Sequence, residues 1–325
     1  MAEITPQLVK QLRDRTGAGM MDCKRALVAA NGDINEAEII LRKQGIASAA
    51  KKQSRSTKQG MVAAHISANG KVGVLVEVNC ESDFVARTDE FQQLAADVAE
   101  HIAVQKPRAV RLEEITEAER ANFKAHEALY EQKFAKDQAG TVADFVKSKI
   151  AKLGENIAIS RFVVYEISGP GVAAHYIHTG SQIGVLLEIR TGSDNVLDNS
   201  DFKILMRDVA MQVAAANPLF VDRQCVPHDL LERERDIQRD RARGEGKPEK
   251  MLDKIVDGRM SKFYEEVCLM DQPFIRENTI SVGELIRNAA GKLGATIEVA
   301  RFTRYKVGDV FDAPGVEETP LPVTA

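Results

Sequence analysis

GVLVEV at residues 73–78 returns as GVLLEI at residues 184–189, and the tripeptide DVA at residues 97–99 returns at residues 208–210. Both pairs are displaced by the same 111 positions (184 − 73). Matching segments at a fixed displacement are typical of an internal structural repeat. The sequence therefore predicts two copies of one folding unit.

Each unit combines strands with a helix. Apolar residues alternate on both sides of the Asn69-Gly70 pair, which predicts a β-hairpin over residues 61–79. Apolar residues then recur at helical spacing, which predicts a helix after the hairpin; they are Phe91, Leu94, Ala95, Val98 and Ile102. We expect an α+β fold with two repeated core subdomains, at residues 60–168 and at residues 169–224 with 276–306.

The ends of the two units match at a different displacement. Leucine and glycine at 153–154, Ile157, and arginine and phenylalanine at 161–162 match residues 293–302, now 140 positions apart (293 − 153). The second copy therefore carries 29 more residues (140 − 111) in its middle. Two amphipathic helices joined at residues 244–248 fill this excess and predict an antiparallel coiled-coil insertion at residues 225–275.

The charges of this insertion are balanced. Residues 228–250 hold seven acidic and seven basic side chains, interleaved along the sequence. Interleaved charges on a helix favour solvated ion pairs over a basic surface that binds the phosphates of a nucleic acid. We interpret the insertion as an arm for protein contact or dimerisation, and an inert solvated insertion is the alternative.

The first residues predict a compact three-helix domain at residues 1–50. Thr5 and Asp33 are expected to cap the first and third helices, Glu36 to complete a capping box with Asp33, and Gly45 to end the third helix. Polar residues without periodicity at 51–59 predict a linker, and residues 307–325 a flexible tail.

The composition argues against a nucleic-acid-binding, disulfide-bonded, exported or membrane-spanning protein. The net charge is −4 with 28% charged residues, so the basic excess that nucleic-acid binding needs is missing. Four cysteines lie far apart without a CxxC pair, which favours reduced buried thiols. The sequence has no apolar run of membrane-spanning length and no signal-peptide pattern at its start. We expect a cytoplasmic protein without direct nucleic-acid or membrane contact.

Enzyme signatures are missing as well. The sequence has no phosphate-binding loop ending in Lys-Ser/Thr, no GxGxxG after a strand and no GxSxG. His175 and His178 are a candidate metal pair, but their odd spacing in a strand directs them to opposite faces. We therefore expect two separate histidines, no cofactor, no metal and no catalytic residue.

The most informative segment is CESDFVAR at residues 80–87, between the hairpin and the helix. Its counterpart 111 positions later is Ser193-Asp194-Asn195-Val196, so serine, aspartate and valine recur while Phe84 is replaced by Asn195. A large apolar residue that the fold does not require, in a polar loop, suggests a contact surface. The alternative is a phenylalanine buried in the core of its own subdomain.

Three segments carry a family resemblance: TGAGMMDCK at residues 16–24, EVNCESDFV at 77–85 and GRMSKF at 258–263. With them the chain resembles the elongation factor Ts family from residue 1 to about 306. The resemblance implies a ubiquitin-associated-like N-terminal domain, a two-part α+β core and a coiled-coil insertion. Ser82 stands where the family has threonine, which keeps the hydroxyl. Prolines at 314, 320 and 322 put in doubt the helical C-terminal module of some members.

The resemblance also implies a function. It implies a non-enzymatic guanine-nucleotide exchange factor that binds elongation factor Tu, GDP-bound and nucleotide-free, displaces Mg²⁺ and promotes GDP release so that GTP can bind. Ser82, Asp83, Phe84 and Val85 would be the partner-binding residues, and Arg13 and Met20 candidates in the N-terminal domain. The alternatives are a ribosome-associated or chaperone-like protein-binding module, and an enzyme with an unrecognised site. Whether the coiled coil forms a homodimer contact or touches the partner stays open.

Overall fold

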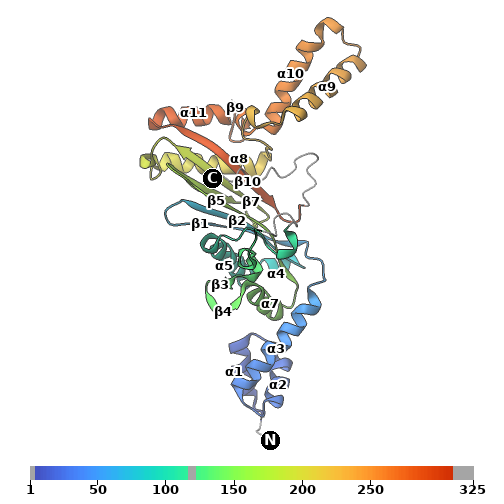
Figure 1. Cartoon of the computed structure of the whole chain (residues 1–325), viewed down its shortest axis with the longest axis vertical. Coiled ribbons are helices and arrows are strands. Elements are labelled where there is room, and N and C mark those ends of the chain that lie inside the picture. The colour runs from blue at the N-terminus through green and yellow to red at the C-terminus, as the bar shows by residue number, and fades with distance from the viewer. Residues whose placement is uncertain (1–3, 116–121, 310–325) are drawn as a thin grey trace.

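The computed structural model describes residues 4–115 and 122–309, and Figure 1 shows three parts in a row. A helical domain lies at the N-terminal end, two subdomains of sheet and helix form the middle, and a helical pair projects from the far end. Within these residues, none of the helices combines the length and apolar character that a membrane span requires. The predicted C-terminal region from residue 310 onward lies outside the described residues.

The N-terminal domain contains α1 (Pro6–Thr16), α2 (Met20–Ala29) and α3 (Ile34–Lys52). Thr5 and Asp33 accept the expected capping hydrogen bonds from backbone N–H groups. The N–H of Asp33 donates to the carbonyl of Ala30, so it is not left for Glu36, as the predicted capping box would need. The small core of this domain consists of Val9, Leu12, Cys23, Ala26, Leu27, Ala30 and Ala37.

The prediction that Gly45 ends the third helix is wrong. α3 continues to Lys52 and includes the first two residues of the predicted linker. A glycine costs a helix interior only about 1 kcal/mol relative to alanine, which packing can offset. Gly45 lies against α7 (Val142–Leu153), where a β-carbon on it would come within 2.8 Å of Ala151 Cβ. The close contact between α3 and α7 explains both the glycine and the longer helix.

The first core subdomain is an antiparallel sheet covered by helices on one face. The sheet has the order β1-β2-β5, with α5 and α7 packed against it (Figure 1). Its elements are β1 (Gln59–Ile66), β2 (Val72–Cys80), α4 (Asp83–Ala86), α5 (Asp89–Gln105), β3 (Lys133–Phe134), β4 (Asp137–Thr141), α7 and β5 (Ile157–Glu166). The predicted hairpin and the helix after it are both present.

The second core subdomain repeats this order, which confirms the internal repeat. Its sheet has the order β10-β7-β6. Its elements are β6 (Gly171–Ile177), β7 (Ile183–Thr191), α8 (Ser200–Ala216), β8 (Pro273–Phe274), β9 (Glu277–Ser281), α11 (Val282–Leu293) and β10 (Ile297–Lys306). Short 3-10 helices lie at Leu112–Glu114, Ala125–Glu127, Leu129–Glu131, Asp194–Val196, Arg223–Cys225 and Leu269–Asp271.

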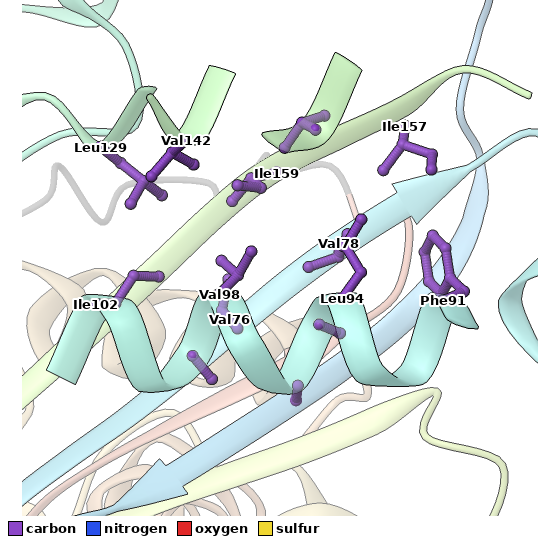
Figure 2. Close-up of a cluster of buried hydrophobic side chains, with 14 of the residues drawn as sticks. Val76, Val78, Phe91, Leu94, Val98, Ile102, Leu129, Val142, Ile157 and Ile159 are labelled. Carbon is purple, nitrogen blue, oxygen red and sulfur yellow. The ribbon is translucent and has the colours of Figure 1, made fainter. Parts of the chain in front are cut away.

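β2 is buried on both of its faces. Val76 and Val78 point to the helix side, where Figure 2 shows them packed with Phe91, Leu94 and side chains of the neighbouring strand β5. Leu75, on the opposite face, joins a core between the two sheets, together with Val62, Tyr165, Ile167, Ala173, Leu186 and Tyr305. The two subdomains therefore pack sheet against sheet, with their helices outside.

Glycines allow the sheets to approach closely. A β-carbon on Gly184 would lie 2.4 Å from Val62 Cγ1, and one on Gly73 would lie 2.7 Å from Ala173 Cβ. Because these two glycines are the matching first residues of the repeated GVL motif, the motif itself encodes the contact between the subdomains.

The insertion in the second subdomain forms an antiparallel helical arm of α9 (His228–Gly244) and α10 (Glu249–Val267), which projects away from the core in Figure 1. Ala242, Leu252, Val256 and Met260 are its buried side chains. Ion pairs link the two helices, among them Arg235 with Asp257 at 3.2 Å. β8 falls inside the range predicted for the insertion but pairs with β9 of the core.

All four cysteines are free thiols. Cys23, Cys80 and Cys268 are buried, but Cys225 is exposed, so the prediction of buried thiols is wrong for Cys225. It lies in a short 3-10 helix at the base of the arm, before the arm's helices begin. Val307 and Gly308, in the predicted flexible tail, make hydrogen bonds to Gln182 and Glu77.

Candidate partner-binding site

The turn between β2 and α5 contains the candidate residues Ser82, Asp83, Phe84 and Val85. Ser82 is the N-cap of α4, and its hydroxyl accepts a hydrogen bond from the Val85 N–H at 3.3 Å. Val85 is half-buried against the first core, and Ala86 is buried in it. Capping and burial thus fix this short helix on both sides.

Phe84 points away from the protein. Its side chain is 81% exposed, the largest exposure among the large apolar side chains that the structure describes. The interpretation of Phe84 as a core residue is therefore wrong, because a core side chain would be shielded from water. A single phenylalanine held outward on an anchored turn is an apolar contact group without a partner in the free protein.

Asp83 lies beside Phe84 in the first turn of α4. Its carboxylate contacts the Arg87 guanidinium at 2.9 Å, but both side chains are substantially exposed. Exposed ion pairs of this kind contribute about 0–1 kcal/mol. A partner can therefore compete for the Asp83 carboxylate at little cost.

The matching turn of the second subdomain has a different arrangement. Asp194 accepts hydrogen bonds from the Gly171 N–H at 3.0 Å and from the Lys71 ammonium at 3.1 Å. These contacts lower the pKa of the Asp194 carboxyl, with the Gly171 N–H the larger cause. Asn195 is exposed and Val196 is buried. The valine holds the turn in both subdomains, whereas the residue before it is free to differ.

Cys80, the last residue of β2, makes a hydrogen bond to the Phe84 turn. Its thiol is buried and donates to the Ser82 carbonyl at 3.1 Å. Burial raises the pKa of Cys80 to about 12, and the nearby Glu155 carboxylate adds to this rise. The group therefore stays a protonated thiol. Thr191 makes the same bond in the second subdomain, from its hydroxyl to the Ser193 carbonyl at 2.8 Å.

The two N-terminal candidates lie on separate helices. Arg13 is exposed on α1, and its carbonyl accepts from the Gly17 N–H, which closes that helix. Met20 begins α2 and is 59% exposed, and its neighbour Met21 is 63% exposed. Both candidates therefore present their side chains to the solvent on either side of the turn at residues 17–19.

The C-terminal end of α7 contacts both candidate regions. A β-carbon on Gly17 would lie 2.7 Å from Lys152 Cε, so the turn between Arg13 and Met20 rests on this lysine. Lys152 also contacts Glu90 at 2.7 Å. Hydrogen bonds from Lys149 and Lys152 lower the pKa of the Glu90 carboxyl. Three residues further along, Glu155 binds Ser82.

Glu155, Glu81 and Asn156 were missed by the sequence reasoning, although they hold the turn. Glu155 accepts from both the N–H and the hydroxyl of Ser82, at 2.9 and 2.6 Å. A signal was present in the second repeat, where Ala295 occupies the position 140 residues after Glu155. A charged residue that only one copy carries is a sign of a role specific to that copy.

The two histidines of the candidate pair lie within β6 and just beyond its end. The Nδ1 atom of His178 contacts the Tyr176 hydroxyl at 3.0 Å, and His175 lies on β6. Among residues 4–115 and 122–309, no three His, Cys, Asp or Glu side chains are grouped to hold a metal ion.

Known proteins are similar to this chain over most of its length. The family model for elongation factor Ts matches residues 81–309. The chain is 42% identical to elongation factor Ts of Nostoc punctiforme over 312 residues, which cover 95% of this chain and 94% of that protein. The protein of Trichlorobacter lovleyi is 41% identical over 306 residues, 94% of this chain and 93% of its own. That of Solibacter usitatus is 40% identical over 98% of this chain and 99% of its own.

The chain belongs to the elongation factor Ts family. Membership confirms the resemblance seen in the sequence and gives the protein a role in translation elongation. The α+β architecture is consistent with the same family. The match to the elongation factor Ts family model begins at Glu81, so it includes the Phe84 turn but neither Arg13 nor Met20.

Proposed function

We propose that this protein is a guanine-nucleotide exchange factor for elongation factor Tu. In this proposal it binds the GDP-bound form, displaces Mg²⁺, promotes GDP release and holds the nucleotide-free form until GTP binds. The observation that carries the proposal is the 81% exposed Phe84 on an anchored turn, in a chain of the elongation factor Ts family.

The chemistry of the turn suits this task. A GTPase holds GDP through donors to the phosphates and through Mg²⁺, whose oxygen ligands require strict geometry. An apolar ring inserted beside such a site displaces the elements that hold the metal. The neighbouring carboxylate of Asp83 can then bind a group that the metal or phosphate held before. Ser82 and Val85 keep both side chains at the tip of the turn.

Exchange then follows from linkage. A factor that binds the nucleotide-free partner more tightly than the GDP-bound partner lowers nucleotide affinity by the same ratio. The factor breaks no covalent bond and acts without a catalytic residue. It selects neither nucleotide, so the concentrations of GTP and GDP in the cytoplasm, where we place the protein, decide which one rebinds.

The N-terminal domain and the arm are further contact surfaces in this proposal. Arg13 and Met20 would dock beside the Phe84 turn, because the turn between them rests on the same end of α7. The arm exposes Ile237 and Met251, at 54% and 46%. Apolar residues on an otherwise charged arm support a protein contact, either with the partner or with a second copy.

The test uses purified elongation factor Tu loaded with fluorescent GDP. A tenth of an equivalent of this protein should accelerate release of all the bound GDP, because an exchange factor turns over. A protein that binds elongation factor Tu once and does not dissociate would release only the amount of GDP equal to its own amount. Equal release rates with and without the protein would refute the proposal and favour a chaperone-like or ribosome-associated role.

A further inference from the structure

Glu155 binds the first residue of the Phe84 turn, Ser82, through two hydrogen bonds. It follows Gly154, the C-cap of α7, and its two carboxylate oxygens accept from the N–H and the hydroxyl of Ser82 at 2.9 and 2.6 Å. Hydrogen bonds to a charged acceptor are stronger than neutral ones. Since Ser82 is the N-cap of α4, this two-point contact sets the direction in which Phe84 leaves the protein.

Glu81 and Asn156 extend this contact to the chain that leaves α3. The Glu81 carboxylate accepts from the Asn156 N–H at 2.6 Å and contacts the Arg55 guanidinium at 3.4 Å. The Asn156 amide donates to the carbonyls of Gln53 and Arg55 at 3.3 and 2.7 Å, and Asn156 is only 4% exposed. One network therefore connects the Phe84 turn with the end of the helix that carries the N-terminal domain.

The second repeat folds without this network. Ala295 and Thr296 replace Glu155 and Asn156 at a displacement of 140, and Gly192 replaces Glu81 at 111. These residues lack the carboxylates on which the network depends. The matching turn is instead held by Asp194, through Gly171 and Lys71. Because a short helical turn forms at this place in both repeats, the fold of the unit does not require the network.

We infer that Glu155, supported by Glu81 and Asn156, is the positioning residue that holds Phe84 ready for elongation factor Tu. This inference rests on the proposed exchange function. An exposed ring on a four-residue helix has little packing of its own, and ordering it on binding lowers affinity. Glu155 orders the turn before the partner arrives.

The test compares Glu155→Ala and Glu155→Gln with the wild type and with Phe84→Ala. Glu155→Ala introduces the residue of the second repeat, and should slow GDP release at low factor concentration about tenfold through loss of a charged hydrogen-bond pair. Glu155→Gln keeps the size and one carbonyl acceptor and should retain an intermediate rate. Asp194→Ala loosens the other turn and is the matched control, with a release rate close to that of the wild type.

Two readouts separate positioning from a general structural role. Amide hydrogen exchange on the free protein should accelerate at residues 82–86 in Glu155→Ala, with the core strands unchanged. In the Phe84→Ala background, Glu155→Ala should slow release less than about twofold further, because it acts through Phe84. An unchanged release rate despite faster amide exchange, or an additive loss in the double variant, would overturn the inference. If the wild type does not accelerate GDP release from elongation factor Tu, the proposed function fails. Amide exchange alone then decides whether Glu155 orders the turn.

Discussion

The two core subdomains have one scaffold and two different surfaces. Their buried residues correspond, as Phe91 and Phe202 do, both fully shielded from water. Their outer turns do not, because Phe84 is replaced by Asn195 and Glu155 by Ala295. The comparison separates what the fold needs from what only the first subdomain does. Residues shared by both copies build the sheet and helix core, and residues of the first copy alone gather around the Phe84 turn.

Truncation of the shared core should have the largest effect. Phe91→Ala and Phe202→Ala should each lower the free energy of unfolding by about 3–5 kcal/mol, because each removes a buried ring and leaves a cavity. Urea unfolding measures both losses. A loss below about 1 kcal/mol in only one of them would break the equivalence of the two cores.

A buried histidine in the first subdomain should contribute to a loss of stability in acid. His101 is 1% exposed, its Nδ1 accepts from the Ala135 N–H, and its Nε2 contacts the Gln132 side-chain oxygen. The ring is therefore neutral, and burial lowers its pKa. The unfolded chain binds the proton more readily, so stability falls as the pH drops below about 6.5, by at most about 1.4 kcal/mol per pH unit.

Gln212 provides the matched control, since it occupies the same place in the second subdomain. It donates to the Gln272 side chain at 3.1 Å and accepts from the Ile275 N–H at 2.9 Å. His101→Gln should therefore keep both bonds and flatten the loss of stability between about pH 6.5 and 5. Lys136 pairs with Asp97 and Glu100 near this site. These charged groups are present in both the wild type and His101→Gln, so they do not account for a difference between the two pH profiles. Identical pH profiles would show that His101 does not titrate as described.

Removal of the arm should have a smaller effect on stability than the core truncations. Val267 must be kept, because its carbonyl accepts from the N–H groups of Leu219 and Phe220 in the core. Replacement of residues 228–266 by a short Gly/Ser link should then leave a single cooperative melting transition, within about 1 kcal/mol of the wild type. Loss of a cooperative transition in calorimetry would show that the second subdomain needs its insertion.

The repeat made much of the fold predictable from the sequence. The matching GVL segments located both central strands, and the change of displacement from 111 to 140 located the arm. The length of α3 was not predictable, because the glycine signal at Gly45 is local and the packing on Ala151 that overrides it is not. Similarly, nothing in the local sequence shows that Cys225 is exposed.

The candidate site was predictable in part. The replacement of Phe84 by Asn195 suggests from the sequence alone that Phe84 is a contact residue, and the exposure of the ring agrees with this. The contact of Glu155 with Ser82 was not predictable from the sequence, because the two residues are 73 positions apart and only the folded chain brings them together. The roles of Ser82, Asp83, Phe84, Val85, Arg13 and Met20 in partner binding stay a prediction.

The central claim is that Phe84 serves the partner and not the fold. Phe84→Ala should slow catalysed GDP release about ten- to a hundredfold, since burial of a phenylalanine in a partner is worth roughly 1.5–3 kcal/mol. Its melting temperature should stay close to that of the wild type, because an 81% exposed ring leaves no cavity when removed. Asn195→Ala is the matched control and should change neither quantity. GDP release and thermal melts on these two variants decide the matter: a large drop in the melting temperature of Phe84→Ala, with normal release from the folded protein, would contradict the account.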